Sequence, residues 1–181
     1  FGVKVIPMGL FVETDSPVIW RGPMVHRAIV QLLGEIAWGE LDYLVVDLPP
    51  GTGDAQLSLC QSVPVSGAVL VTTPQSIALS DVRKALAMFT SLKVPVLGIV
   101  ENMAEFACPH CKTTSRVFSQ GGAKALAEKH GIPLLGSVPL DPLVCDGGEM
   151  GSPVTASQPG SASAKVFREI ARLAAARVPA A

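Results

Sequence analysis

The segment that decides the fold reads Leu44-Val45-Val46-Asp47-Leu48-Pro49-Pro50-Gly51-Thr52-Gly53-Asp54. Its apolar half predicts a strand over 44–48 that is buried on both faces, as strands of parallel sheets are. Asp47 then falls near the carboxyl end of that strand, where ligand sites form in open α/β sheets, and an aspartate there can hold Mg²⁺ through water. Gly51 allows backbone amides to approach a phosphate closely, and Asp54 can cap a helix over 55–61. The segment favours a nucleotide site, with an ordinary strand-to-helix turn as the alternative.

The rest of the chain alternates short apolar runs with amphipathic stretches, which is typical of a parallel sheet covered by helices. We expect further strands at 3–6, 68–71, 96–100 and 134–138. Apolar residues recur at the helical period over 24–38, 76–92, 121–130 and 162–178. A stretch rich in Pro, Gly and Ser predicts an extended crossing over 147–163. The 181 residues therefore fit one α/β domain.

The composition argues against several classes of protein. The net charge is −1 and no basic run occurs, so a nucleic-acid partner is not expected. The apolar stretches are too short for a membrane span, and no secretory signal is visible. Charged residues make up only 16% of the chain, which suggests surface that faces a partner subunit or a missing piece of the domain. Four cysteines do not make a disulfide framework here, which favours a reducing compartment.

Two of those cysteines form a C-x-x-C pair, Cys108 and Cys111. A tight turn can point both sulfurs the same way, so the pair can bind one metal ion or cluster. A [4Fe–4S] cluster or a structural Zn²⁺ needs four ligands, so a second copy of the chain across a two-fold axis would complete the site. Cysteine sulfurs alone do not separate iron from zinc. Cys60 is interpreted as a buried residue that packs in an apolar helix, and Cys145 as a cysteine with no ligand role.

The motifs of this chain, taken in order, resemble those of the Mrp/ApbC family of P-loop ATPases, which are iron–sulfur cluster carriers. They are Trp20-Arg21-Gly22-Pro23-Met24, Trp38-Gly39-Glu40-Leu41-Asp42-Tyr43, the string at 47–54, Thr73-Pro74-Gln75, Gly98-Ile99-Val100-Glu101-Asn102-Met103, Cys108-Pro109-His110-Cys111, and Leu135-Gly136 with Val138-Pro139-Leu140-Asp141. The resemblance implies an α/β fold with a doubly wound, mostly parallel sheet of the ParA/MinD type, lacking its amino-terminal strand and P-loop. It implies a single, incomplete nucleotide-binding domain over 1–181 with a cysteine-containing cluster-binding insert at 104–118.

The resemblance also implies roles in ATP chemistry. Asp47 corresponds to the Walker B aspartate that supports Mg²⁺, and Gly51 to Asp54 correspond to the switch that senses the γ-phosphate. Asn102 corresponds to the asparagine that reads the adenine edge. The family's Walker A loop lies upstream of the matched region and has no counterpart in this sequence. We therefore expect ATP hydrolysis of the full-length protein and not of this chain alone, because the loop supplies the main cradle for triphosphate.

The same resemblance implies that the backbone of Pro139, Leu140 and Asp141 flanks the adenine base. It further implies that Cys108 and Cys111 hold a [4Fe–4S] cluster at a homodimer interface and pass it to apo iron–sulfur proteins, with no nucleic-acid or membrane partner. The expected compartment is the cytoplasm of a bacterium, or the mitochondrial matrix if the source is eukaryotic. Two alternatives stay open: a ParA/MinD-type positioning ATPase and a zinc-stabilised interaction domain.

Overall fold

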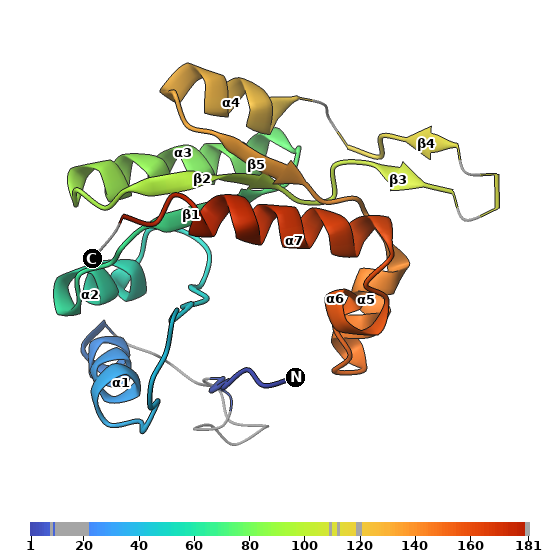
Figure 1. Cartoon of the computed structure of the whole chain (residues 1–181). Coiled ribbons are helices and arrows are strands. Elements are labelled where there is room, and N and C mark those ends of the chain that lie inside the picture. The colour runs from blue at the N-terminus through green and yellow to red at the C-terminus, as the bar shows by residue number, and fades with distance from the viewer. Residues whose placement is uncertain (8, 10–21, 109, 112, 119–120, 180–181) are drawn as a thin grey trace. The chain divides into compact units, whose positions relative to one another are not determined.

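The structure is a computed structural model that describes residues 1–7, 9, 22–108, 110–111, 113–118 and 121–179 (Figure 1). The motif residues Trp20 and Arg21, and Pro109 between the paired cysteines, lie outside the described residues. The chain folds as two compact units, Phe1–Pro64 and Val65–Ala181. Each unit is described separately below.

A parallel sheet forms the centre of the second unit. Its strands are β1 (Ala68–Thr72), β2 (Val96–Glu101) and β5 (Leu134–Ser137), in the order β1-β2-β5. Both strand pairs are parallel, as the apolar runs predicted. The middle strand is the most deeply buried, with Ile99 fully enclosed.

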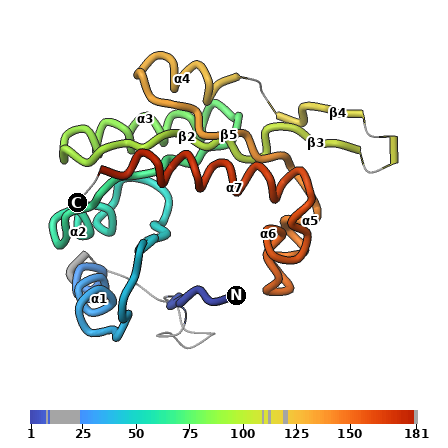
Figure 2. Tube along the Cα trace, viewed as in Figure 1, coloured from blue at the N-terminus to red at the C-terminus, as the bar shows by residue number. Residues whose placement is uncertain are grey.

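Helices cover both faces of this sheet (Figures 1 and 2). On one face, α3 (Ser76–Ser91) packs on β1 and β2, and α4 (Gly122–His130) packs on β2 and β5. On the other face lies α7 (Ala162–Ala175). There the core residues Val100, Leu135 and Val138 pack against the apolar stripe formed by Val166, Phe167, Ile170, Leu173 and Ala174. The predicted doubly wound α/β arrangement is confirmed for this unit.

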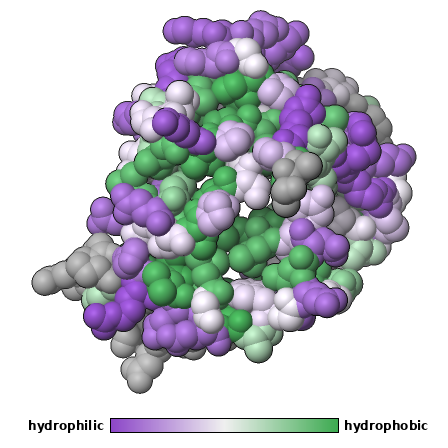
Figure 3. Space-filling model, turned by 60° about the vertical axis from the view of Figure 1, so that its left-hand side comes forward, coloured by the Kyte–Doolittle hydropathy of each residue, from purple (hydrophilic) through white to green (hydrophobic). Residues whose placement is uncertain are grey.

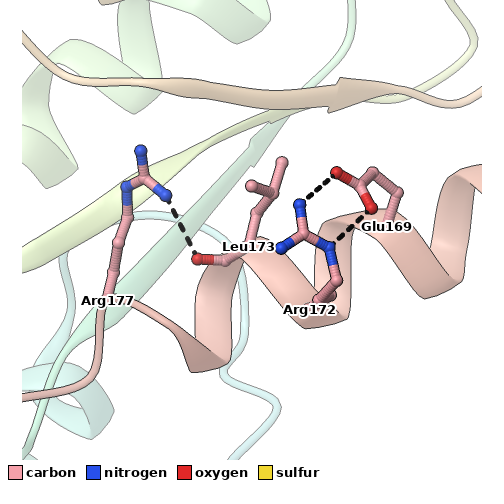
Figure 4. Close-up of polar contacts among 4 residues, drawn as sticks. All are labelled: Glu169, Arg172, Leu173 and Arg177. Carbon is pink, nitrogen blue, oxygen red and sulfur yellow. Dashed lines mark hydrogen bonds and ion pairs between the residues drawn. The ribbon is translucent and has the colours of Figure 1, made fainter.

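One glycine permits the close approach of α7 to the sheet. A Cβ added at Gly136 would lie 2.8 Å from Cγ1 of Ile170. Away from this stripe α7 is polar: Arg172 pairs with Glu169 through two hydrogen bonds of 2.7 and 2.9 Å (Figure 4). Just beyond the end of the helix, Arg177 Nη1 donates to the Leu173 carbonyl at 3.3 Å. The helix is thus amphipathic as its sequence period predicted.

Two short helices replace the extended crossing that we expected over 147–163. They are α5 (Pro142–Glu149) and α6 (Val154–Ser157). Asp141 caps α5, and Pro142 occupies the first turn, where its missing N–H costs nothing. Val154 anchors α6 with 4% of its side chain exposed. The stretch is helical because it has a good cap and an apolar anchor, despite its Gly and Pro content.

The described residues of the first unit form two helices, α1 (Gly22–Gly34) and α2 (Asp54–Ser62), which pack on each other. The predicted strands at 3–6 and 44–48 are wrong, because both segments are irregular in structure. A strand needs hydrogen-bonded neighbours, and within the described residues neither segment belongs to a sheet. Their side chains are accordingly exposed, Val45 by 88%.

Apolar side chains reach the surface in both units, and green areas interrupt the polar surface in Figure 3. In the second unit they include Val71 on β1 and Ile77 in the first turn of α3, which are 59% and 78% exposed. No helix within the described ranges has the length and hydropathy needed to cross a membrane.

Candidate functional site

The carboxyl end of β2 holds Asn102 by two contacts. Its backbone N–H donates to the Thr72 carbonyl at 2.7 Å, which ties it to the end of β1. Its side-chain Oδ1 accepts a hydrogen bond from the Met103 N–H at 2.9 Å, and Met103 adopts a positive φ of 55°. The amide oxygen of Asn102 therefore already accepts a hydrogen bond within the protein. The remaining Nδ2 donor is the group that could bond a ring nitrogen of a base.

The chain beyond β5 runs beside the chain beyond β2. Val138 N–H donates to the Glu101 carbonyl at 2.7 Å, and Ala104 N–H returns a bond of 3.0 Å to the Val138 carbonyl. Leu140 N–H then donates to the Glu105 carbonyl at 2.7 Å. On the segment after β2, these bonds are made by Glu101, which precedes Asn102, and by Ala104 and Glu105, which follow it. The structure therefore brings together the two elements expected to flank an adenine, Asn102 and the 139–141 backbone.

The carboxylate of Asp141 is committed to the fold. Its Oδ1 accepts from the Leu143 N–H at 3.0 Å, and its Oδ2 accepts from the Ser163 hydroxyl at 2.5 Å. Ser163 is fully buried at the start of α7. Asp141 thus joins the segment after β5 to two helices, and each of its carboxylate oxygens accepts a hydrogen bond within the fold.

Glu101 is a buried acidic residue that sequence analysis did not single out. It is 9% exposed, and its Oε2 lies 3.4 Å from the Ser137 hydroxyl, which belongs to the paired position on β5. Its Oε1 is buried and has no hydrogen-bond partner among the described residues. The only sequence signal was an acidic residue at the end of an otherwise apolar strand.

A short hairpin carries the paired cysteines. Strands β3 (Phe106–Ala107) and β4 (Thr114–Ser115) are antiparallel, and the Cys108 N–H extends their ladder by donating to the Thr113 carbonyl at 3.0 Å. At its root Phe106 forms an isolated bridge with Leu140. The hairpin therefore starts from the same backbone that flanks Asn102, and it leads away from the sheet (Figure 1).

The Cys111 thiol is exposed and activated by its neighbours. Its sulfur lies 3.3 Å from the Thr113 hydroxyl oxygen. Hydrogen bonds with the Thr113 side chain, then its backbone, and then the Cys108 side chain lower the pKa of Cys111 to about 7. Thiolate is the form that ligates metal and attacks electrophiles, so Cys111 is prepared for either at neutral pH. Thr113 was missed from the sequence, although its place two residues after the pair was visible.

The other two cysteines differ from this pair. Cys60 on α2 is half-buried, and burial raises the pKa of its thiol. Cys145 is exposed on α5. Among the described residues, no group of three or more His, Cys, Asp or Glu side chains could hold a metal ion together. The described part of one chain therefore offers the C-x-x-C pair as two ligands.

The segment expected to contact phosphate lies in the first unit. Asp47 is exposed, and Gly51 has a φ of 96°, a left-handed conformation that favours glycine. The expected cap at Asp54 is wrong: Gly53 occupies the N-cap position without a side-chain bond, and Asp54 is the first residue of α2. The helix begins one residue earlier than predicted, and the carboxylate still lies in the first turn, where the helix dipole favours negative charge.

Comparison with known proteins identifies the family. The ParA family model described as the NUBPL iron-transfer P-loop NTPase matches residues 1–175. The chain belongs to this family.

Its solved structural relatives agree in fold. A nucleotide-binding protein from Archaeoglobus fulgidus in complex with ADP has a TM-score of 0.65 at 44% identity, over 71% of this chain and 53% of that one. The cell division ATPase MinD of Pyrococcus furiosus has a TM-score of 0.60 at 25% identity, over 84% of this chain and 57% of that one.

Curated members of the family are similar over almost the whole chain. "Iron-sulfur protein required for NADH dehydrogenase, mitochondrial" of Arabidopsis thaliana is 48% identical over 95% of this chain and 55% of its own length. "Iron-sulfur cluster transfer protein NUBPL" of Mus musculus is 50% identical over 94% of this chain and 54% of its own length. "Iron-sulfur cluster carrier protein" of Helicobacter pylori is 49% identical over 95% and 47%. The chain thus spans about half the length of the curated relatives it matches.

Proposed function

We propose that this chain is the cluster-binding part of an iron–sulfur cluster carrier. Two copies hold one [4Fe–4S] cluster as cargo between their Cys108 and Cys111 pairs and deliver it to apo-proteins. ATP binding and hydrolysis, in the full-length protein, control the exchange. The names of the relatives support the carrier role. The observation that carries the proposal is the pair of adjacent thiols at the tip of an exposed hairpin, one of them activated by Thr113.

The ligand count supports a cluster shared between two copies. Each chain contributes two thiolates, and a [4Fe–4S] cluster takes four, so a two-fold axis at the hairpin tip completes the set. The exposed position of Cys111 suits such an axis because a second copy can approach it without disturbing the sheet. It also suits delivery, since separating the two copies leaves the cargo with half of its ligands.

The nucleotide part of the proposal rests on two separate sets of residues. Asn102 and the backbone of Pro139 and Leu140 would bind the adenine base at the carboxyl edge of the sheet. Asp47 would support Mg²⁺ through water, and residues 51–54 would sense the γ-phosphate. A direct backbone connection then links base to cargo, because Leu140 bonds Glu105 and bridges Phe106, two residues before Cys108.

The relatives come from bacteria and from mitochondria, so we expect the bacterial cytoplasm or the mitochondrial matrix as the compartment. Both are reducing, which keeps the two thiols available as ligands.

Anaerobic reconstitution with iron and sulfide tests the proposal. We expect a brown protein that elutes as a dimer and contains about four iron atoms per dimer, with charge-transfer absorption in the visible range. The variants Cys108→Ser and Cys111→Ser should lose this absorption. Cys145→Ser is the matched control, because that thiol is also exposed but lies on α5, and it should keep the full absorption.

Two results of this experiment would contradict the proposal. A colourless protein that retains stoichiometric zinc would show a zinc-stabilised domain instead. A brown protein that remains monomeric would show that one chain binds a cluster without sharing it with a second copy. Delivery is measured separately, as the appearance of holo-protein signal when an apo-ferredoxin is mixed with the loaded carrier.

A further inference from the structure

One buried amide in the first unit is directed at the turn that follows Asp47. Gln56 lies near the start of α2 and is only 3% exposed. Its Nε2 donates to the Pro49 carbonyl at 2.6 Å and to the Gly51 carbonyl at 3.0 Å. Carbonyl oxygens only accept hydrogen bonds, so these two contacts fix the orientation of the amide. The nitrogen points to the turn, and the oxygen is buried without a partner among the described residues.

The two bonds hold a stretch of backbone that has little other support. Residues 49–51 belong to no helix or strand. Gly51 is in the left-handed region, and among the described residues beyond its chain neighbours no atom lies within 4 Å of where its Cβ would be. One side chain, that of Gln56, instead binds the carbonyl groups of Pro49 and Gly51. That side chain belongs to the helix whose first residue is Asp54.

We propose that Gln56 is a positioning residue for the phosphate-sensing turn. Its amide attaches the backbone of residues 49–51 to α2, so that the turn and Asp54 move as one body. The inference rests on the proposed function, in which residues 51–54 sense the γ-phosphate of ATP. Gln56 acts through the two carbonyl groups, and its contribution is geometric: it limits the positions that Gly51 and the following amides can adopt.

The chemistry of the site distinguishes this role from simple packing. Gln56→Glu keeps the size of the side chain but places a carboxylate against two carbonyl oxygens, so both hydrogen bonds are lost at neutral pH. Burial raises the pKa of a carboxyl group, and in mild acid the protonated form regains one donor. Gln56→Met has similar length and no donor at any pH. Gln61→Glu is the matched control, because Gln61 is exposed on the same helix.

Hydrogen exchange of the Leu57 amide, which donates to the Gly53 carbonyl at 3.4 Å and so joins α2 to the turn, tests the attachment in this chain without nucleotide. At pH 8 we expect Gln56→Glu and Gln56→Met to exchange roughly tenfold faster than wild type, because lost hydrogen bonds increase local opening. At pH 5 Gln56→Glu should approach the wild-type rate and Gln56→Met should not. Gln61→Glu should match wild type at both pH values.

Wild-type exchange in both Gln56 variants would overturn the proposal, and so would a Gln56→Glu variant that stays fast at pH 5. If Gln56→Met unfolds the first unit, the ratio of the Gln56→Glu rate to the wild-type rate, taken at each of the two pH values, still decides. Far-UV circular dichroism of each variant identifies such unfolding.

Steady-state ATP hydrolysis by the full-length gene product separates this inference from the proposed function. We expect Gln56→Glu to lower kcat roughly tenfold or more while KM for Mg·ATP changes by less than about threefold, since misplacement of a catalytic turn affects the reaction more than binding. An unchanged kcat would overturn the positioning role. A wild-type protein that does not hydrolyse ATP would contradict the proposed function instead, and the exchange experiment would still decide whether Gln56 holds the turn.

Discussion

Two stretches of this chain have almost the same apolar character and different structures. Residues 96–101 form β2, the middle strand of the sheet, and from Leu97 onward they are all buried. Residues 44–48 are equally rich in Val and Leu, yet they are irregular, with Leu44 46% and Val45 88% exposed. The difference lies in the neighbours. β2 has a parallel partner on each side, whereas 44–48 has none in the described part of the chain.

This contrast shows that strand propensity reports how well a side chain fits a pleated, half-buried surface. The backbone of an isolated segment gains nothing from Val or Ile unless another strand accepts and donates its hydrogen bonds. The same dependence on neighbours holds for the polar groups at the site. Three predictions test it, from the largest expected effect to the smallest.

The first prediction compares truncations in the two stretches. Ile99→Ala removes a fully buried side chain and should lower the free energy of unfolding by about 2–5 kcal/mol, through lost burial and the cavity left behind. Val45→Ala should change it by less than about 0.5 kcal/mol because that side chain is exposed. Urea unfolding followed by circular dichroism measures both. Equal effects would break the comparison and would mean that 44–48 is buried in solution.

The second prediction concerns the end of β5. Asp141→Ala removes the cap of α5 and the acceptor of the buried Ser163 hydroxyl, so we expect a loss of about 1–3 kcal/mol in unfolding free energy. Asp146→Ala, at an exposed position on the same helix, is the control and should stay close to wild type. A loss no larger than that of the control would show that Asp141 does not hold the two helices together.

The third prediction extends the comparison to cysteine chemistry. Alkylation of Cys111 by iodoacetamide should be half-maximal near pH 7, because hydrogen bonds with Thr113 lower its pKa to about 7. The rate at Cys60 should still be rising at pH 9, because burial raises the pKa of that thiol. Although thiolates of lower pKa are weaker nucleophiles, we expect at least a roughly fivefold advantage for Cys111 at pH 7. Peptide mass spectrometry resolves the two sites.

A matched variant sharpens this prediction. Thr113→Val removes the hydroxyl and should move the Cys111 profile to higher pH, because thiol deprotonation then loses its main hydrogen-bond support. An unchanged profile in Thr113→Val would contradict the assigned cause.

Much of the second unit could be predicted from the sequence. The strands at 68–71, 96–100 and 134–138 were found within one residue of their observed ends, because apolar runs and helical periods report burial on a sheet that is present. The strand at 44–48 was predicted by the same rule and is wrong, since the rule assumes neighbours. The extended crossing predicted over 147–163 is wrong. The prediction followed the Pro, Gly and Ser content and gave no weight to the helix cap at Asp141 or to the apolar side chain of Val154.

The candidate site was predicted in part. The resemblance led to Asn102, to 139–141 and to the cysteine pair, and the structure places the first two elements side by side and starts the hairpin of the third from the same edge. Two residues that hold parts of the proposed sites were missed: Gln56, which bonds the turn at 49–51, and Thr113, which bonds Cys111. Gln56 and Thr113 act through hydrogen bonds whose partners depend on the geometry of a turn, and no periodicity or spacing in the sequence records that geometry.

The hairpin has a consequence for how such a protein can evolve. Its two strands have two residues each, the described residues His110 and Cys111 at its tip are exposed, and at its root Phe106 bridges Leu140 in the segment after β5. If the proposed function holds, substitutions at the tip would change the cluster ligands without weakening the core, and substitutions in the core would change stability without altering the ligands. Selection on the proposed cargo and selection on folding would then act on separate sets of positions, and one scaffold could acquire a new metal preference through a handful of exposed residues.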